Sequence, residues 1–413
     1  MKRDDDGSLT ASGRKAGELA KLITPIPDFY ITTKNAGGDP VVDGARWRMV
    51  LDGEMNRPVQ VDLRRIRALP SVTVAKTLEC ISNLVTRCEE APFGCDFIST
   101  AEWRGAHFTD VLALAGGLKP NVRSFAIIGA DEYSASIPSS SGIMADLVLA
   151  YEMNGETLRL EHEYPLRLII PDRYGYKNAK WVAGIRALNS VHVDWYGARG
   201  WSADGIVKTM SRIDVPANGA QMTPGEHRAE GIAYAGARGI RTIEFSADGG
   251  ATWTPARLVE PPIGRDVWTR WESTFTLRPG QPMELTVRAI DGAGQRQNEQ
   301  YSLVPPDGQS GRHAITVAPV WPRGSISGPD RSGSTHLVGA SLAADGGFWP
   351  MASTRSRPSQ EAGSGGGRAG TLAASFSAWI AQAAAGATYA KSSLNPMAAA
   401  RACPKTQFAA RVS

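Results

Sequence analysis

Cys80 is the residue whose position most clearly suggests chemistry. It lies just after residues 71–78, SVTVAKTL, an apolar run with the composition of a β-strand. A turn at the end of a strand can direct a thiol into a cleft, and a thiolate there can bind a soft or late transition metal. The residues alone leave another interpretation open, because a free cysteine is more often a small buried apolar side chain.

A second group of candidate functional residues occupies residues 158–181, LRLEHEYPLRLIIPDRYGYKNAKW. Cations and an imidazole alternate with aromatic rings, as a planar cofactor that carries a phosphate requires. A nucleic acid is recognised by similar residues. Composition alone favours a third interpretation, an ordinary strand-loop-strand with a solvated basic rim. Its basic residues include His162, Arg167, Arg173, Lys177 and Lys180.

The elements that must position these residues fall into four regions. Residues 1–24 are expected to be a flexible N-terminal segment. In residues 25–205, Met49 and Leu51 alternate with polar positions like a strand, and Asp62 is a plausible N-cap for a helix that begins after it. This mixture of periodicities predicts an α+β domain. Short alternating runs such as TIEFSADGGATW and MELTVRAIDGAG predict an all-β sandwich over residues 206–320. Residues 321–413 are rich in Gly, Ser and Ala, and we expect a low-complexity, disordered tail.

Bulk composition excludes several classes of protein. The chain has 413 residues, 42% of them hydrophobic, and a formal net charge of only +4, so no nucleic-acid partner is expected. Its four cysteines are too few for a disulfide-stapled secreted scaffold. Neither an export signal nor a membrane span is recognisable, which predicts a soluble, cytoplasmic protein.

Several motifs occur in a fixed order along the chain. In the first domain they are FYITTKN, TLECISN, AEWRGAHFTDVLALAG, DEYSASIP and the segment of residues 149–181. In the second they are KTMSRIDVP, SADGGATW and RAIDGAGQRQ. Taken together and in order, these motifs resemble the sulfite oxidase family of molybdopterin enzymes over most of residues 25–320, and those of the second domain look like the family's immunoglobulin-like dimerisation domain. By that resemblance a periplasmic or extracytoplasmic location is also compatible.

The resemblance implies a molybdenum-molybdopterin cofactor in which Cys80 is the protein's ligand to the metal. It implies oxygen-atom transfer, such as sulfite oxidation to sulfate, with the electrons passed to an external partner such as a cytochrome. A homodimer is expected, and no heme, since no C-x-x-C-H motif occurs. Besides Cys80, the catalytic residues it implies are Trp103 and Lys34, and the cofactor-binding residues are Asn35, Asn83, His162, Arg167, Lys177 and Lys180.

The sequence departs from the family pattern at the substrate-binding positions. Lys34 stands about where sulfite oxidases carry an arginine, and a lysine lacks the bidentate fork. Leu84 and Val85 replace a second arginine, after which TRCEEAPFGC looks inserted, and we hypothesise that Arg87 compensates. The family's catalytic tyrosine has no secure counterpart, because Trp201 stands where a tyrosine is expected and Tyr196 lies nearby in the sequence.

These departures keep other functions open. One is a reductase of sulfoxides or other oxo-acids on the same cofactor, and another is a protein inactivated by the insertion. A third is a cofactor-free module that binds polyanions or mediates adhesion. Zinc binding is not expected, because Cys80, Cys88 and Cys95 lack a C-x-x-C pair, and Cys88 and Cys95 are candidates for a small disulfide loop.

Overall fold

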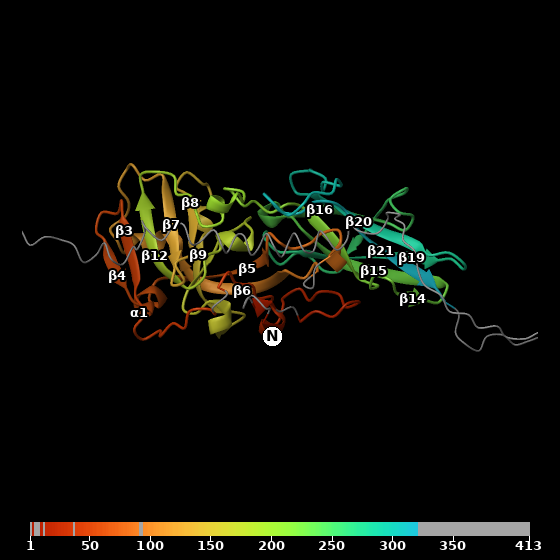
Figure 1. Ribbon diagram of the computed structural model, residues 1–413, viewed down its shortest axis with the longest axis horizontal. Coiled ribbons are helices and arrows are strands. Elements are labelled where there is room, and N and C mark those ends of the chain that lie inside the picture. Colours follow the sequence, from red (N-terminus) through yellow and green to blue (C-terminus); the bar gives the residue numbers. More distant parts are fainter. Residues whose placement is uncertain (1, 4–8, 11–12, 36–37, 91–93, 321–413) are drawn as a thin grey trace, which may run out of the picture. The chain divides into compact units, whose positions relative to one another are not determined.

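The computed structural model describes residues 2–3, 9–10, 13–35, 38–90 and 94–320 (Figure 1). These residues form mainly β-strands, with two short α-helices, α1 (Leu63–Arg67) and α2 (Phe108–Ala113). None of the described helices is long and apolar enough to cross a membrane. The predicted tail, residues 321–413, lies outside the described part of the chain.

The sheet that carries Cys80 has the strand order β10-β9-β6-β5, with β11 paired to β9. All of its pairings are antiparallel. The strand predicted over residues 71–78 is confirmed, because β5 covers Ser71–Glu79 and Cys80 follows it directly. The other strands are β6 (Ile98–His107), β9 (Val148–Met153), β10 (Glu156–Thr157) and β11 (Arg167–Ile169).

A second sheet has the order β4-β3-β12-β7-β8, in which β12 runs parallel to β3 and antiparallel to β7. Its bounds are β3 (Met49–Gly53), β4 (Val59–Val61), β7 (Ser124–Gly129), β8 (Ser134–Pro138) and β12 (Val182–Leu188). The expected helix start is confirmed, because Asp62 accepts a hydrogen bond from the backbone N–H of Arg65 at 2.8 Å and so caps α1.

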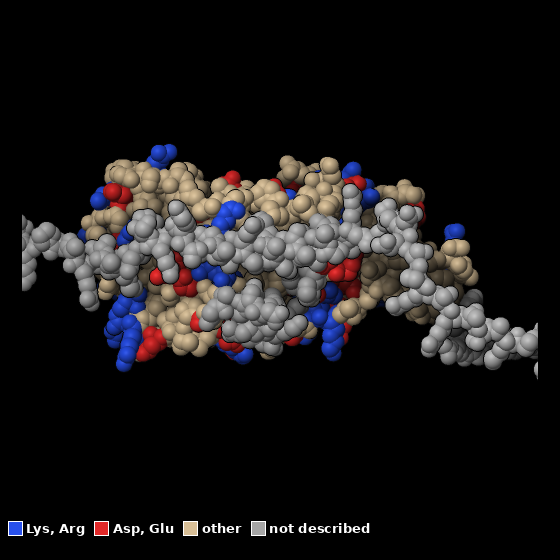
Figure 2. Space-filling model, in the orientation of Figure 1, with Lys and Arg blue, Asp and Glu red and all other residues tan. Residues whose placement is uncertain are grey.

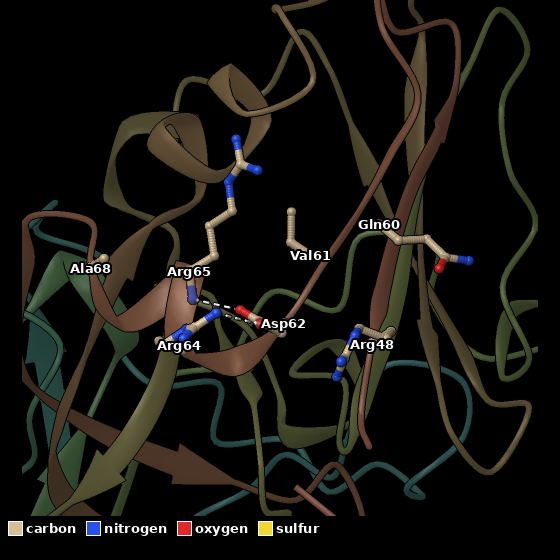
Figure 3. Close-up of a pocket in the computed structure, with 7 residues that line it drawn as sticks. All are labelled: Arg48, Gln60, Val61, Asp62, Arg64, Arg65 and Ala68. Carbon is tan, nitrogen blue, oxygen red and sulfur yellow. Dashed lines mark hydrogen bonds and ion pairs between the residues drawn. The ribbon is translucent and has the colours of Figure 1, made fainter. Parts of the chain in front are cut away.

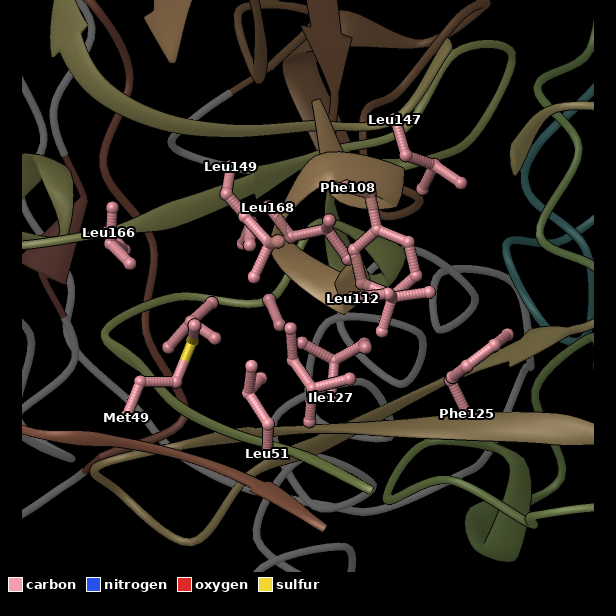
Figure 4. Close-up of a cluster of buried hydrophobic side chains, with 14 of the residues drawn as sticks. Met49, Leu51, Phe108, Leu112, Phe125, Ile127, Leu147, Leu149, Leu166 and Leu168 are labelled. Carbon is pink, nitrogen blue, oxygen red and sulfur yellow. The ribbon is translucent and has the colours of Figure 1, made fainter. Parts of the chain in front are cut away.

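The main core of this region joins side chains from both sheets and from α2 (Figure 4). Met49 and Leu51, predicted to share a strand face, are both fully buried in it. Burial of apolar area on this scale provides the principal stabilisation of the sheets that hold the site. Other members labelled in Figure 4 are Phe108, Leu112, Phe125, Ile127, Leu147, Leu149, Leu166 and Leu168.

Residues 210–319 contain the strands of two further sheets that share one apolar core. One has the order β13-β15-β19-β18, with bounds Met210–Val215, Gly225–Tyr234, Thr269–Leu277 and Arg257–Leu258. The other has the order β14-β21-β20-β16-β17, with bounds Gln221–Met222, His313–Pro319, Met283–Asp291, Ile240–Ser246 and Thr254–Pro255. The predicted strands in TIEFSADGGATW and MELTVRAIDGAG are thus present. The domain boundary at residue 206 and the immunoglobulin-like character stay predictions.

Short elements complete the described chain. β1 (Lys2–Arg3) pairs with β2 (Leu9–Thr10). The 3-10 helices are η1 (Ile26–Asp28), η2 (Cys88–Glu90), η3 (Met144–Asp146), η4 (Leu160–His162), η5 (Gly175–Lys177), η6 (Gly197–Arg199) and η7 (Gly236–Arg238).

The strand that ends at Cys80 is bound tightly to the second pair of sheets. The Lys76 ammonium lies 2.5 Å from a carboxylate oxygen of Asp266, and the backbone N–H of Thr77 donates to the Asp266 carbonyl at 2.8 Å. The hydroxyl of Tyr234 donates to the Thr77 carbonyl and to Asp266. Contacts with the sheets of residues 210–319 therefore help to hold β5 in position.

Part of the N-terminal segment also contacts both regions. Arg14 pairs with Asp96 at 2.6 Å, and the backbone N–H of Ala20 donates to Asp214 at 2.9 Å. The indole N–H of Trp268 donates to the carbonyl of residue 22 at 3.1 Å. The flexibility expected of residues 1–24 stays a prediction, but these contacts hold its later part against the folded chain.

Candidate functional site

Cys80 has a free, half-buried thiol at the end of β5. Its backbone N–H donates to the Phe97 carbonyl at 2.8 Å, and its own carbonyl accepts from the N–H of Asn83 at 2.9 Å. Burial raises the pKa of the Cys80 thiol, while hydrogen bonds from Ser82 and the charge of Lys180 act in the opposite direction. The turn thus fixes the backbone around the thiol that we predict to bind the metal.

Asn83 holds this turn rather than pointing a free amide outward. Its Nδ2 donates to Oε1 of Glu79 at 3.0 Å, and its Oδ1 accepts from the N–H of Phe97 at 3.1 Å. The other carboxylate oxygen of Glu79 is buried without a hydrogen-bond partner among the described residues. Burial raises the pKa of Glu79 to about 7.

Glu163 brings two of the predicted cofactor-binding cations together. Its buried carboxylate pairs with the guanidinium of Arg167 and with Nζ of Lys180, the latter at 2.9 Å. Burial alone would raise the pKa of Glu163, but the charges of Arg167 and Lys180 lower it below the ordinary value, so the carboxylate is ionised. We call these three residues the Glu163 cluster. Lys180 also donates to the Thr32 carbonyl at 2.5 Å.

Arg167 has a donor available for a further partner. Its guanidinium lies 5.2 Å from the ring centroid of Trp103, and its Nε is buried without a hydrogen-bond partner among the described residues. A buried donor without an acceptor is unfavourable by about 1–3 kcal/mol. A polar or anionic group bound beside Arg167 would remove that penalty.

His162 lies beside the cluster at the end of η4. Its Nε2 is 3.2 Å from the Ile26 carbonyl, and its ring meets that of Phe29 edge-on with centroids 5.6 Å apart. Burial lowers the pKa of His162, and the charge of Arg167 acts in the same direction. The imidazole is therefore neutral at pH 7.

Lys34 and Asn35 both contact the carboxylate of Asp131. Nζ of Lys34 lies 2.9 Å from Oδ1 of Asn35 and 3.3 Å from a carboxylate oxygen of Asp131. Nδ2 of Asn35 donates to Asp131 and Asp39, at 3.3 and 3.1 Å. The ammonium of Lys34 also lies 5.7 Å from the ring centroid of Trp195. Lys34 therefore belongs to a network of partners.

Lys177 is buried and forms an ion pair with Asp194. Asp194 also accepts hydrogen bonds from the backbone N–H of Gly197 at 2.7 Å and of Ser136 at 3.2 Å. The pair therefore holds the start of η6 against β8. It positions the neighbouring Tyr196, and the contacts of Lys177 itself are all within the protein.

Tyr196 is the candidate tyrosine of the site. Burial raises its pKa, and a charge on Cys80 acts in the same direction. Its ring packs against those of Tyr176 and Trp201, with centroids 5.4 and 5.3 Å apart. Of the two aromatic candidates in the sequence, Tyr196 is the one that has a hydroxyl.

Two other candidates, Trp103 and Arg87, contact side chains elsewhere in the protein. Trp103 has no exposed surface and lies in the apolar core beneath Arg167, so it supports that guanidinium instead of lining a pocket. Arg87, hypothesised to replace a missing arginine, pairs with Glu90 at 2.9 Å and stacks on Tyr301 at 4.9 Å. It belongs to a different surface, lined in part by Glu284, Glu299 and Arg312.

Sequence reasoning missed two residues of the site, Glu163 and Tyr30. Glu163 stands between His162 and Arg167, and an acidic residue inside a basic segment was the available signal. Tyr30 gave no signal beyond its motif. Its hydroxyl is 3.0 Å from where a Cβ at Gly175 would lie, and that point is 3.9 Å from Cα of Cys80. Any side chain at Gly175 would therefore crowd this contact.

A surface hollow of about 630 Å³ lies elsewhere, between β4 and α1 (Figure 3). Arg48, Arg64 and Arg65 line it, and none of the predicted site residues does. On the face shown in Figure 2, basic and acidic groups lie beside one another, in keeping with the small net charge.

Comparisons with known proteins agree with this geometry. The family model of the oxidoreductase molybdopterin binding domain matches residues 36–196. Sulfite oxidase of Gallus gallus is 30% identical over 340 residues, which cover 73% of this chain and 70% of that protein. Sulfite oxidase of Arabidopsis thaliana is 27% identical, covering 72% of this chain and 87% of the relative.

Among solved structures, the sulfane dehydrogenase SoxCD of Paracoccus pantotrophus matches with a TM-score of 0.65 and 24% identity, over 73% of this chain and 82% of that chain. This match confirms the predicted fold class. The chain is thus a molybdopterin-binding oxidoreductase. It belongs to the sulfite oxidase family, and this membership favours an enzyme over a cofactor-free binding module.

The residues present fit a molybdenum-molybdopterin cofactor. Cys80 offers a thiol, and among the described residues it is the cysteine that is free. The unpaired Nε of Arg167 and the partly exposed ammonium of Lys180 offer donors to the polar edge and phosphate of a pterin. A soft sulfur ligand with nearby phosphate donors is the combination this cofactor requires.

Proposed function

We propose that this oxidoreductase oxidises sulfite. Sulfite and water give sulfate, two protons and two electrons, and the electrons pass to an external acceptor. The bound cofactor supplies the two-electron redox chemistry. The observation that carries the proposal is the free thiol of Cys80 at the end of β5, together with the two cations of the Glu163 cluster. The names of the Gallus gallus and Arabidopsis thaliana relatives support sulfite as the substrate.

The protein's part begins with holding the cofactor. Cys80 is the metal ligand, and Asn83 fixes its turn through Phe97. Arg167 and Lys180 bind the polar groups of the cofactor, while Glu163 keeps both cations oriented. His162 contributes a neutral imidazole, and Asn35 and Lys177 act indirectly, through Asp131 and Asp194.

Lys34 and Tyr196 are proposed to act on the substrate. The ammonium of Lys34 attracts the oxyanion, and its contacts with Asn35 and Asp131 set its position. Because burial raises the pKa of Tyr196, its hydroxyl stays protonated and donates a hydrogen bond to a substrate oxygen. Trp103 is a positioning residue that acts through Arg167.

A second candidate function is reduction of sulfoxides on the same cofactor. One observation favours it, namely that Lys34, the cation proposed to attract the oxyanion, already pairs with Asp131. A neutral sulfoxide needs less cationic surface than a doubly charged sulfite.

The test combines metal content with turnover. Wild type and Cys80→Ser are expressed in a host that makes the cofactor, and molybdenum per chain is measured by elemental mass spectrometry. We expect about one molybdenum in wild type and little in the variant, with both chains folded by circular dichroism. Sulfite turnover with an artificial electron acceptor is then compared with reduction of methionine sulfoxide. Folded wild type without molybdenum would contradict the cofactor assignment, and a preference for the sulfoxide would favour the second function.

Two partners are part of the proposal. By analogy with the family, residues 206–320 mediate a homodimer, and a small electron-transfer protein such as a cytochrome accepts the electrons. Light scattering of the purified chain tests the dimer, which a monomer at micromolar concentration would contradict. Reduction of a cytochrome in the presence of sulfite tests the acceptor.

A further inference from the structure

The loop after the Cys80 turn contains a disulfide between Cys88 and Cys95, whose Cα atoms lie 5.0 Å apart. The sulfur of Cys88 belongs to a half-buried residue, while Cys95 is 2% exposed. The bridge lies in the segment that looks inserted relative to the family. No part of the proposed function uses it.

His313 places a proton donor against this disulfide. The backbone N–H of Ile213 donates to Nδ1 of His313 at 3.1 Å, so Nδ1 carries no proton. In the neutral ring the proton is therefore on Nε2, which lies 3.2 Å from Sγ of Cys88. Burial and the charge of Arg212 lower the pKa of His313 to about 4, so the ring is neutral at pH 7.

The same geometry argues against a metal ion at these residues. The ligand atoms of Cys88, Cys95 and His313 lie within 4.8 Å of one another, a spacing that suits a metal. A metal on Nε2 would require the proton to move to Nδ1, where it would face the N–H of Ile213. A proton on Nε2 instead suits a hydrogen bond to a thiolate.

The disulfide also joins the Cys80 turn to the second pair of sheets. The backbone N–H of Leu84 donates to the Gly94 carbonyl at 3.3 Å. The carbonyl of Phe97 accepts from the N–H of Cys80, and the N–H of Phe97 donates to the side-chain oxygen of Asn83. On the other side, buried Arg212 on β13 donates to the carbonyl of Cys95. The bridge therefore clamps the loop segment before β6, which borders the predicted metal ligand.

We propose that the Cys88–Cys95 disulfide is a reversible redox site, that dithiols are its substrates, and that His313 stabilises its reduced form. A thiolate of the dithiol attacks Sγ of Cys88, the less buried of the two cysteines, and Cys95 leaves as a thiolate that takes up a proton. The second thiol of the dithiol, as a thiolate, then attacks the dithiol's sulfur in the mixed disulfide and releases the Cys88 thiolate beside His313. The protein gains two electrons and one proton, the second proton goes to the solvent, and the dithiol becomes a disulfide.

Reduction loosens the clamp beside the Cys80 turn. The amides of Cys80 and Leu84 bond to carbonyls of Phe97 and Gly94, which the closed loop holds in place. The exchange chemistry itself does not depend on the role of Cys80 in catalysis. Failure of sulfite oxidation would therefore leave this proposal standing.

The sequence makes the redox state directly measurable. Trypsin cleaves after Lys76, Arg87 and Arg104, so Cys88 and Cys95 share one peptide and Cys80 lies in another. The full chain is equilibrated with mixtures of reduced and oxidised dithiothreitol, alkylated, and digested. We expect two alkyl groups to appear reversibly in the peptide of residues 88–104 while circular dichroism is unchanged. Reduction only with loss of the folded signal would overturn the proposal.

A His313→Gln variant tests whether His313 stabilises the reduced form. The control is His227→Gln, because His227 lies half-buried on β15 and its Nε2 lies 2.7 Å from the Thr223 carbonyl. Loss of a charge-assisted hydrogen bond should shift the equilibrium about tenfold toward the protein disulfide. This shift corresponds to a change of ~30 mV in the reduction potential of the disulfide. The control should not shift it. An unchanged equilibrium in His313→Gln would overturn the role of His313.

Two further measurements address the clamp and the metal alternative. Hydrogen exchange of peptides covering residues 80–85 should speed up on reduction, while peptides of β20 should not change. Equal exchange in both redox states would overturn the clamp. Binding of one zinc per reduced chain, lost in His313→Gln, would replace the exchange site by a metal site.

Discussion

The ammonium of Lys76 lies 2.5 Å from the carboxylate of Asp266, and the two side chains are only 2% and 10% exposed. Lys76 is on β5, the strand that ends at the proposed metal ligand, whereas Asp266 precedes β19 and also accepts from the hydroxyl of Tyr234. One buried ion pair thus connects the proposed active-site strand with the second pair of sheets.

Replacing Lys76 by Met should destabilise the protein strongly. The change leaves the Asp266 carboxylate buried without its ammonium partner, and breaking a buried pair in this way costs about 3–5 kcal/mol. Urea unfolding measures the loss. Lys119→Met removes an exposed pair with Glu54 and should cost less than about 1 kcal/mol. Equal losses in the two variants would contradict the buried role of Lys76.

Arg167→Gln should lower the molybdenum content. The substitution removes the unpaired Nε donor and one of the two cations bound to Glu163. Loss of such a group typically lowers affinity at a metal site by about 10- to 100-fold. The control is Arg159→Gln, because Arg159 pairs with Glu156 on the surface. Molybdenum per chain is measured for both, and an unaltered content in Arg167→Gln would exclude Arg167 from cofactor binding.

Tyr196→Phe should reduce sulfite turnover and leave the cofactor in place. The variant keeps the ring that packs on Tyr176 and Trp201 but removes the hydroxyl that we propose donates to the substrate. Removal of one preorganised donor typically lowers kcat by about 10²–10³-fold. Tyr301→Phe, at an exposed tyrosine, is the control. Wild-type kcat in a fully loaded Tyr196→Phe enzyme would rule out a catalytic hydroxyl.

His313 should make stability depend on pH between about 6.5 and 4. Its folded pKa is lowered to about 4, mainly by burial, with Arg212 and Arg14 acting in the same direction and Asp214 against them. The unfolded chain therefore binds the proton first as the pH falls, so stability is complete above pH 6.5 and declines below it. The expected loss is about 1.4 kcal/mol per pH unit, or about 2 kcal/mol at pH 5.

The measurement is urea unfolding at pH 7 and pH 5 for wild type and His313→Gln. Other groups titrate in the same interval, so the quantity of interest is the difference in pH dependence between the two chains. The variant should lack about 2 kcal/mol of the wild-type decline. Parallel pH profiles would show that His313 is not a buried neutral imidazole.

Local pattern in the sequence was enough to predict much of the first domain. The alternation of Met49 and Leu51, the Asp62 cap and the apolar run before Cys80 all describe interactions between near neighbours, and each element is present. The order of the motifs predicted the family, because cofactor binding needs several residue types at separate points of the chain. The comparisons confirm the family.

Tertiary structure alone decided which side chains share partners. Glu163 holds Arg167 and Lys180 together, Trp103 is buried beneath Arg167, and Arg87 turns toward Glu90 and Tyr301. His313 meets Cys88 across 225 positions of sequence. Such contacts depend on how sheets pack, and side chains distant in sequence carry no periodic signal of one another. The sequence by itself determined the family and the predicted metal ligand, and the packing determined how its neighbours are held.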